Sequence, residues 1–401
     1  MSYMPLGDRI VKREEGPLRI AQFLPPGSSS WGEIMVSAIN NKGMGGRETA
    51  VVKLGEQFAI QGHHVTCFTP VEKNTYQEFD SGGILEFIDA RTGRVMLENN
   101  FYDVVISWEY PDIFEWDRLI ENSRLRIVGM QCAHLIYNIA PYHENIDAYV
   151  CLSNWAKDFL PHSLVTDVDA DDIYVIPNGV DLSRYPIEAA NSHPEDRAER
   201  NFFIYSSSPD RGLLHVLNMW PKIRNVLPDS ILHVGYGIEN WTSHTKWSHN
   251  LQGDDAVQIL KLINQKGVIN RGLMGQQELA ETQLLCSALL YPCDTHQPTE
   301  TGCITVTEAL AAMLPAVITD CDCLGSEYKE VTAMIDLTSP FDEDTYIDVL
   351  CDTLKNKETY RRMQIEGREF AEKRTWERTS QSWLSLMDTL LNEQLARSVT
   401  S

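Results

Sequence analysis

Two glutamates separated by seven residues, Glu300 and Glu308, are the sharpest chemical signal in the sequence. They lie at the expected start of a helix over residues 304–312. A carboxylate only accepts hydrogen bonds, which suits it to hold paired sugar hydroxyls. If both glutamates lay on one helix, their separation of roughly 12 Å would exceed the roughly 5 to 9.5 Å that a glycosidase pair requires. Ligand binding is therefore favoured over hydrolysis.

Arg211 is the second signal, in the segment 206–212 with the sequence Ser-Ser-Ser-Pro-Asp-Arg-Gly. This segment follows an expected strand and begins an expected helix over 212–226. A fixed guanidinium at the positive end of a helix would stabilise a diphosphate. The alternative is an Asp-Arg pair that merely decorates a surface turn.

The loop 43–48, Gly-Met-Gly-Gly-Arg-Glu, is the third signal, and it precedes a helical pattern over 49–61. Gly45 and Gly46 would let backbone N–H groups approach a phosphate or a sugar oxygen closely. A plain flexible turn is the alternative. The glycines are misplaced for the dinucleotide fingerprint GxGxxG.

Short apolar strands alternate with helical segments from residue 18 to residue 176, and again from 202 to 319. This alternation predicts an α/β protein with two doubly wound parallel sheets. We expect an N-terminal Rossmann-like, acceptor-binding domain over 1–187, a polar linker over 188–201, and a C-terminal Rossmann-like, nucleotide-sugar-binding domain over 202–376. Residues 377–401 are expected to form a helix that packs back on the N-terminal domain. A ligand would bind in the cleft between the carboxyl ends of the strands.

Composition narrows the class of partner. The 401 residues include 57 Asp and Glu against 34 Lys and Arg, which gives a formal net charge of −23. Such an acidic chain disfavours nucleic acid and anionic membrane surfaces as partners. No apolar run approaches the roughly 20 residues of a membrane span, and residues 1–17 lack the apolar core of a secretory signal. We therefore expect no transmembrane segment and a cytoplasmic location.

The nine cysteines form no CxxC pair and no common zinc spacing, so buried free thiols and no metal site are expected. Asp320 and Asp322 spell Asp-x-Asp, but they follow a strand beyond the glutamate helix and are interpreted as a polar turn.

Five segments together resemble glycosyltransferase family four. They are the Gly-Gly-Arg-Glu loop, residues 61–65 (Gln-Gly-His-His-Val), residues 176–181 (Ile-Pro-Asn-Gly-Val-Asp), the helix opening at Arg211, and residues 300–308 followed by Ala309 and Pro315. They occur in the family's order over about residues 18–395. The resemblance implies a GT-B fold, two Rossmann-like domains facing a central cleft, and a retaining, metal-independent enzyme that requires no cofactor.

The resemblance also implies roles for individual residues. Glu308 would hold the ribose of the donor, and Glu300 with the backbone of Gly302, Cys303 and Ile304 would hold the transferred sugar and its phosphate. Arg211 matches the family's lysine and would neutralise the diphosphate. His134 falls where the family has a histidine near the reacting sugar, although such a histidine is often only a structural hydrogen-bonding group.

The donor-binding set is Glu308, Gly45, Gly46, Ser206, Gly302, Cys303 and Ile304. Asn178 and Gly179 would shape the domain junction, and residues 271–274 would meet the base.

The sequence departs from the family pattern at three positions. Ser206 stands where the family usually has an arginine, which leaves the diphosphate one cation short. Met313 replaces a glycine and would remove the usual left-handed residue after the helix. Gly302 replaces an aromatic residue.

We therefore expect a retaining glycosyltransferase that transfers a glucose- or mannose-type hexose from a UDP- or GDP-linked sugar to an acceptor hydroxyl in glycan synthesis. The acceptor would be a glycan or a small soluble molecule. An epimerase or a phosphorylase of the same build, or a catalytically silent nucleotide-sugar-binding protein, is the alternative. The second half offers no convincing lysine for the pyridoxal phosphate of a phosphorylase.

Overall fold

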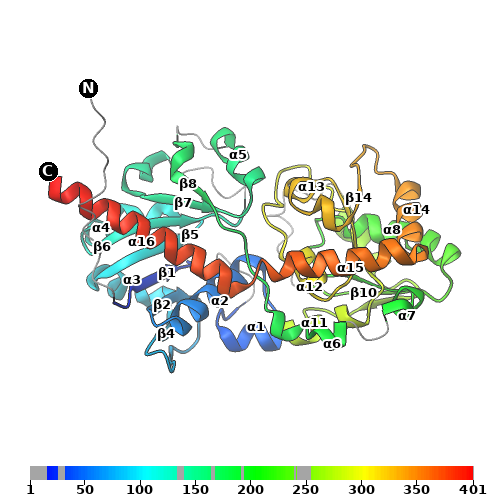
Figure 1. Ribbon diagram of the computed structural model, residues 1–401, viewed down its shortest axis with the longest axis horizontal. Helices are drawn as coiled ribbons and strands as arrows, with labels where there is room; N and C mark the ends of the chain where they lie inside the picture. The colour runs from blue at the N-terminus through cyan, green and yellow to red at the C-terminus, as the bar shows by residue number, and fades with distance from the viewer. Residues whose placement is uncertain are drawn as a thin grey trace.

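The computed structural model describes residues 16–25, 32–132, 140–163, 168–190, 194–238, 241 and 254–400. These residues form two lobes, each built on one β-sheet (Figure 1). The first lobe contains strands β1–β8 and helices α1–α5, and the second contains strands β9–β14 and helices α8 and α10–α15.

The first-lobe sheet has the order β3-β4-β2-β1-β5-β6-β7-β8, and only β3 runs antiparallel, against β4. Its central strands are almost wholly buried, which explains their continuous apolar sequence. The strands are β1 (Arg19–Phe23), β2 (His64–Thr69), β3 (Thr75–Glu78), β4 (Ile84–Asp89), β5 (Tyr102–Trp108), β6 (Ser123–Gly129), β7 (Ala148–Cys151) and β8 (Ile173–Val175).

Helices cover both faces of this sheet and enclose two apolar clusters. The α-helices are α1 (Val36–Lys42), α2 (Gly46–Ile60), α3 (Ala90–Asn99), α4 (Asp117–Glu121) and α5 (Asn154–Ser163). Short 3-10 turns are η1 (Pro111–Glu115), η2 (Ala140–Asn145), η3 (Ala170–Asp172) and η4 (Leu182–Arg184). The loop predicted over 43–48 therefore includes the first turn of α2, which begins at Gly46, and α1 precedes this loop.

The second-lobe sheet is parallel throughout and has the order β11-β10-β9-β12-β13-β14. Numbered within the lobe this is 3-2-1-4-5-6, the Rossmann order. The strands are β9 (Phe202–Tyr205), β10 (Ile231–Val234), β11 (Val268–Asn270), β12 (Ala288–Tyr291), β13 (Ala316–Thr319) and β14 (Ala333–Ile335).

Helices enclose this sheet too, around one large apolar cluster. They are α8 (Leu213–Val226), α10 (Asp255–Leu262), α11 (Gln276–Leu285), α12 (Ile304–Ala311), α13 (Cys323–Tyr328), η6 (Lys329–Val331), α14 (Glu343–Lys355) and α15 (Lys357–Glu372).

The chain crosses back to the first lobe through its last helix, α16 (Trp376–Thr400). Helix α15 runs along one side of the second lobe, and α16 continues from it along the first lobe (Figure 1). Trp376 and Trp383 are buried in a first-lobe cluster, and the ring centroids of Trp383 and Trp108 are 5.8 Å apart. These large aromatic side chains fix the helix on that sheet because burying each one removes a large apolar area from water.

The interval 188–201, expected to be a polar linker with little to bury, contains helical segments and a buried arginine. α6 (Ile187–Ala190) and α7 (Pro194–Glu199) lie here, and Arg197 is only 1% exposed. Its guanidinium donates to the carbonyl oxygens of Cys286, Ala312 and Met313 at 2.6, 2.8 and 3.1 Å, and also to that of Gln283. The composition of the interval does not predict that Arg197 is buried and binds carbonyl oxygens, because an arginine is rarely buried without a carboxylate.

Met313 keeps the left-handed backbone that the sequence predicts to be lost, with φ of 52°. The left-handed residue at the end of α12 is therefore present, although a methionine occupies it at some conformational cost. The hydrogen bond from Arg197 to the Met313 carbonyl oxygen helps to hold this turn.

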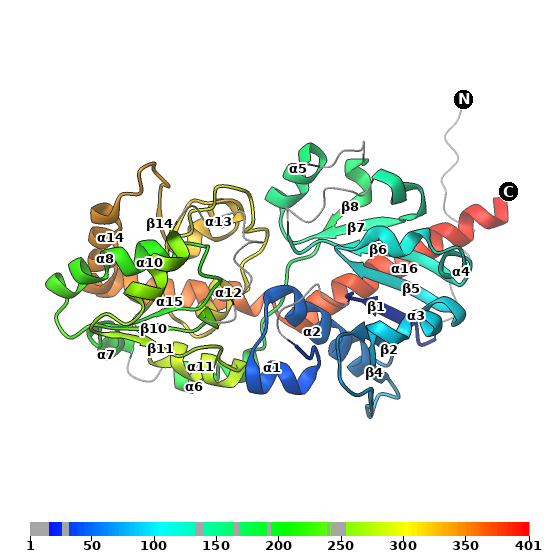
Figure 2. The ribbon, with the colours of Figure 1, turned by 180° about the vertical axis from the view of Figure 1, so that it is seen from behind.

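The two lobes touch at several points. Helix α1 lies beside α11 (Figure 2). A Cβ on Gly43 would lie 2.1 Å from the carbonyl oxygen of Met274, and the Thr301 hydroxyl donates to the Gln131 carbonyl oxygen at 2.7 Å. The carboxyl ends of the strands in both sheets therefore face a shared, closed junction.

Candidate functional site

A cavity of about 400 Å³ lies at this junction, a volume typical of small-molecule sites. Its second-lobe wall comes from the loops after β9, β10 and β12 and from the start of α12. Its first-lobe wall comes from the loops after β6 and β7 and from the start of α2. β9 and β12 are neighbours at the point where the strand order reverses, which is where open α/β sheets bind ligands.

Arg211 reaches from the loop after β9 to the carboxylate of Glu300. The next residue, Gly212, has φ of 97°, and a Cβ there would lie 1.9 Å from the Pro292 carbonyl oxygen, so the turn requires glycine. Arg211 Nη1 and Glu300 Oε1 form an ion pair, and the Tyr291 hydroxyl donates to the same oxygen at 2.9 Å. Burial opposes the charge, but the Glu300 carboxylate raises the pKa of Arg211 well above its usual value. The guanidinium therefore stays charged.

Asp322 holds the loop that carries Glu300. Its Oδ2 accepts hydrogen bonds from the backbone N–H groups of Thr299 and Glu300 at 2.9 and 3.0 Å, and from the Thr295 hydroxyl at 3.1 Å. Asp322 also has φ of 50°, a strained value for a residue other than glycine. Burial raises its pKa, and the hydrogen bonds that it accepts lower it. The sequence interpretation of this aspartate as a plain polar turn missed its positioning role.

Glu308 lies on the second turn of α12 and lines the cavity. It is 9% exposed, and no hydrogen bond joins its carboxylate to another described residue. Burial raises its pKa from 4.5 to about 7, against the opposing effect of the Arg184 charge. A carboxylate held in this way is ready to accept hydrogen bonds from a ligand.

The first-lobe wall begins at Gly45 and Gly46, where α2 starts. A Cβ on Gly46 would lie 3.5 Å from Ile304 Cδ1, so the N-termini of α2 and α12 approach each other across the cavity. The N–H groups in the first turn of each helix have no carbonyl partner within that helix, and the positive end of a helix dipole lies there. Two such ends from different lobes make a region of positive potential that suits an anion.

Arg47 and Glu109 form an ion pair beside this helix start that the sequence did not reveal. Arg47 Nη1 lies 2.6 Å from Glu109 Oε2, and its Nη2 lies 3.0 Å from Glu48 Oε1. Glu109 follows β5 with φ of 64°, and its Oε1 accepts from the Gln131 N–H at 3.1 Å. The partners are 62 residues apart in sequence, so no local pattern could have joined them.

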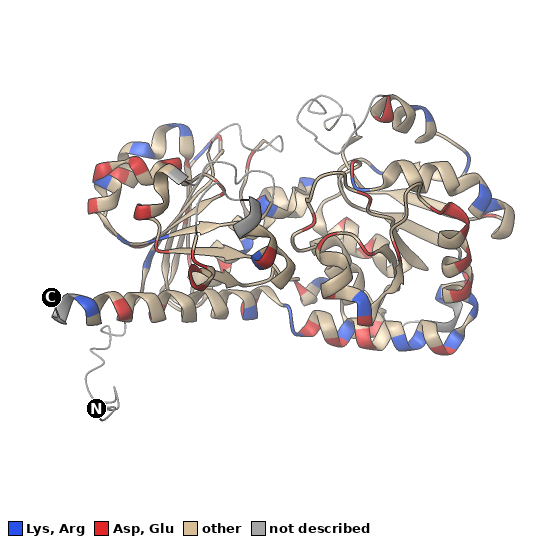
Figure 3. Cartoon of the chain, turned by 90° about the horizontal axis from the view of Figure 1, so that it is seen from above, with Lys and Arg blue, Asp and Glu red and all other residues tan. Residues whose placement is uncertain are grey.

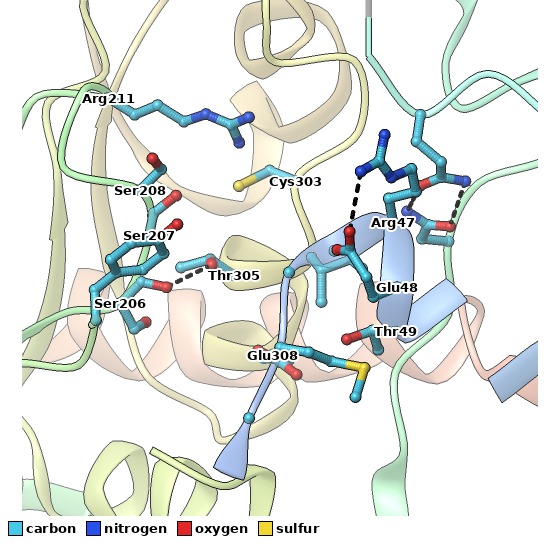
Figure 4. Close-up of a pocket in the computed structure, with 18 of the residues that line it drawn as sticks. Arg47, Glu48, Thr49, Ser206, Ser207, Ser208, Arg211, Cys303, Thr305 and Glu308 are labelled. Atoms are coloured by element: carbon cyan, nitrogen blue, oxygen red, sulfur yellow. Dashed lines mark hydrogen bonds and ion pairs between the residues drawn. The ribbon is translucent and has the colours of Figure 1, made fainter. Parts of the chain in front are cut away.

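Ser206 lies on the opposite wall, together with Ser207 and Ser208 (Figure 4). Its carbonyl oxygen accepts from the Thr305 hydroxyl at 2.9 Å, which ties the loop after β9 to the first turn of α12. Its own hydroxyl is buried and has no hydrogen-bond partner among the described residues. A buried hydroxyl in this state is available to a ligand in the cavity.

The packing around Gly302 explains why glycine stands here in place of the family's aromatic residue. A Cβ at this position would lie 2.6 Å from the Leu152 Cβ of the first lobe. An aromatic residue here would therefore separate the lobes. Cys303 is the N-terminal cap residue of α12, and burial raises the pKa of its thiol, which keeps it protonated.

The structure brings nine of the ten predicted site residues to this one cavity. They are Gly45, Gly46, Ser206, Arg211, Glu300, Gly302, Cys303, Ile304 and Glu308. His134 lies outside the described residues. Asn178, Leu273 and Met274 also line the cavity, whereas Arg271, in the same predicted base-contacting loop, does not.

The part of the chain that the structure describes contains neither a metal-binding cluster nor a membrane-spanning helix. There, no group of three or more His, Cys, Asp or Glu side chains could hold a metal ion. None of the helices in that part is both long enough and apolar enough to cross a membrane.

No protein-family model matches the sequence, and no match emerges among curated proteins. Solved structures do match. Sucrose-phosphate synthase from Thermosynechococcus elongatus is 14% identical with a TM-score of 0.67, over 93% of this chain and 99% of that chain. AviGT4, a glycosyltransferase involved in avilamycin A biosynthesis, is 16% identical with a TM-score of 0.61, over 94% and 98%.

HepE from Anabaena, solved in complex with UDP-glucose, is 12% identical with a TM-score of 0.59, over 96% of this chain and 99% of that chain. At these identities the likeness establishes the fold. The chain has the GT-B fold, with two Rossmann-like units facing a central cleft, and this confirms the fold class predicted from the sequence.

Proposed function

We propose that the protein is a retaining glycosyltransferase that transfers a hexose from a UDP- or GDP-linked sugar to an acceptor hydroxyl, without a metal ion. The observation that carries the proposal is the single cavity in which Arg211, two helix N-termini and Glu308 meet. The likeness to HepE, which was solved with UDP-glucose, supports a nucleotide-sugar donor.

In this proposal Glu308 binds the ribose. Its carboxylate lines the cavity, and its ionised form would accept hydrogen bonds from two ribose hydroxyls. The cost of burying the charge is offset only when a ligand supplies such donors. This accounts for a glutamate whose carboxylate has no hydrogen-bond partner among the described residues.

The diphosphate would lie between the N-termini of α2 and α12, beside Arg211. Phosphate oxygens would accept hydrogen bonds from backbone N–H groups at both helix starts. The departing diphosphate gains negative charge as the bond to the sugar breaks, and fixed positive charge stabilises it at that moment. Arg211 is held in place for this role by Glu300.

Direct displacement from the side of the leaving group would retain the anomeric configuration without a protein nucleophile. Glu300 is poorly suited to be a nucleophile, because Oε1 accepts from both Arg211 and Tyr291. Its role in the proposal is to orient Arg211 and hold the transferred sugar. His134 keeps the role near the reacting sugar that the resemblance implies.

The acidic excess of the chain lies mainly outside the cavity. Figure 3 shows acidic positions along the outer helices of both lobes, interspersed with basic ones. A glycan or a small soluble acceptor fits such a surface better than nucleic acid or an anionic membrane does.

A catalytically silent nucleotide-sugar-binding protein is the second candidate, because Ser206 leaves the second lobe without the family's arginine. A turnover assay separates the two. The chain is incubated with UDP- and GDP-hexoses and a panel of sugar acceptors, and free nucleoside diphosphate is measured for wild type and for E300Q.

The proposal predicts release of diphosphate by wild type and a large loss in E300Q, with NMR showing that the product keeps the anomeric configuration of the donor. Tight nucleotide binding with no turnover, unaffected by E300Q, would reject the enzyme in favour of the silent protein.

A further inference from the structure

The cavity contains fewer positive than negative side chains. Among the described residues that line it, the charged ones are Arg47, Arg211, Glu48, Glu300 and Glu308. Two guanidinium groups thus face three carboxyl groups. A nucleoside diphosphate brings at least two further negative charges, so its binding requires every available cation to contribute.

The second lobe supplies only one of these cations. Arg211 is shared with Glu300. Ser206 offers a buried hydroxyl, which has no hydrogen-bond partner among the described residues, but a hydroxyl carries no charge. The other cation in the cavity therefore comes from the first lobe.

Arg47 is the second residue of α2, beside the helix start that faces α12. Its side chain is 11% exposed, and the residue lines the cavity. Figure 4 shows Arg47 and Arg211 on opposite sides of the cavity, with Cys303 between them in this view. Burial raises the pKa of the Cys132 thiol, which also lines the cavity, and the charges of Arg47 and Arg211 both oppose this rise.

Glu109 holds Arg47 in this place. The carboxylate is fully buried, its backbone has the left-handed φ of 64°, and it lies 2.6 Å from the guanidinium. A strained backbone that aims a buried carboxylate at a cavity-lining arginine is costly, and such cost is typical of functional sites. Glu109 is therefore a positioning residue for Arg47, and a competitor for its charge.

We propose that Arg47 supplies the second cation that binds the diphosphate of the donor, in the place of the arginine that Ser206 replaces. This inference rests on the proposed function and deepens it. Because Arg47 and Arg211 belong to different lobes, both cations meet the diphosphate only when the cleft is closed.

Calorimetric titration with a nucleoside diphosphate and its monophosphate tests the assignment. UDP with UMP and GDP with GMP are used, and the pair whose diphosphate binds wild type is followed. R47Q should weaken diphosphate binding by about tenfold or more, the value of one charged hydrogen bond, while monophosphate binding changes much less. Adding S206R to R47Q should restore much of the loss.

The variant E109Q tests the same assignment independently, because it keeps Arg47 and changes only its partner. Removing the competing carboxylate charge should strengthen diphosphate binding and leave monophosphate binding nearly unchanged. Thermal melts of each variant check that it is folded.

An equal loss of diphosphate and monophosphate binding in R47Q, with no rescue by S206R, would make Arg47 purely structural and overturn the proposal. A change in E109Q that alters diphosphate and monophosphate binding by the same factor would also overturn it. If wild type binds neither UDP nor GDP, the proposed function itself fails, which is a distinct outcome.

Discussion

Replacing Glu308 with glutamine should stabilise the unliganded protein at pH 8 and leave its stability almost unchanged near pH 4.5. Burial raises the pKa of Glu308 from 4.5 to about 7. Folding therefore favours the protonated carboxyl, and the stability present below pH 4.5 is lost as the pH rises through 7. One pKa unit corresponds to about 1.4 kcal/mol, so the full loss is about 3 kcal/mol above pH 7. Glutamine has nearly the same shape and avoids this loss.

Urea unfolding of wild type and E308Q at pH 5 and pH 8 measures the effect, with E330Q as a control at an exposed glutamate. We expect E308Q to exceed wild type by about 2–3 kcal/mol at pH 8 and by less than about 1 kcal/mol at pH 5. E330Q should be neutral at both. If E308Q is less stable than wild type at pH 8, or if its advantage is the same at both pH values, the burial argument is wrong.

The same ionisation has a functional counterpart. If the ionised carboxylate accepts hydrogen bonds from the ribose, nucleotide affinity in wild type should rise between pH 6 and pH 8 and level off above pH 8. E308Q should bind the nucleotide more weakly, without this dependence on Glu308. A gain in stability accompanied by a loss of binding is the pattern expected of a residue retained for its ligand.

Three further substitutions test other parts of the structure. R197M should cost about 3–5 kcal/mol of unfolding free energy in urea, because it removes a buried cation and the four hydrogen bonds that it donates to backbone carbonyl oxygens; a loss below about 1 kcal/mol would contradict the role given to Arg197. D322A should lower turnover and destabilise the Glu300 loop by about 1–3 kcal/mol, whereas D322N, which still offers an oxygen and tolerates left-handed φ, should retain more of both; equal losses in the two variants would argue against the hydrogen-bonding role. G302V should reduce donor turnover by forcing the lobes apart, and the added substitution L152A should recover part of the loss; additive defects would show that the two residues do not meet.

The alternation of strands and helices predicted the fold because each short apolar strand is buried on both faces of a parallel sheet. The site residues in the loops after β9 and β12 could also be predicted from the sequence, because both loops follow parallel strands. Parallel strands deliver such loops to one edge of a sheet, so Arg211 and Glu300 meet although 89 residues separate them.

Pairings that depend on the packing of particular loops were beyond the sequence. Glu109 carries no motif, and only the close approach of the ends of β5 and α2 gives it Arg47 as a partner. Asp322 looked like part of a polar turn because its hydrogen bonds go to the backbone of a loop more than 20 residues away. Arg197 lies in a stretch whose composition resembles a linker, yet its side chain enters the core to pair carbonyl oxygens from distant segments.

The most direct test of the central claim is calorimetric titration of wild type and R211A with UDP and GDP at pH 8. The account predicts saturable one-to-one binding of at least one of them to wild type, and a loss of about tenfold or more in R211A while the variant remains folded. Binding that R211A leaves unchanged, or no binding of either nucleotide by wild type, would contradict a diphosphate site in the cavity between the lobes.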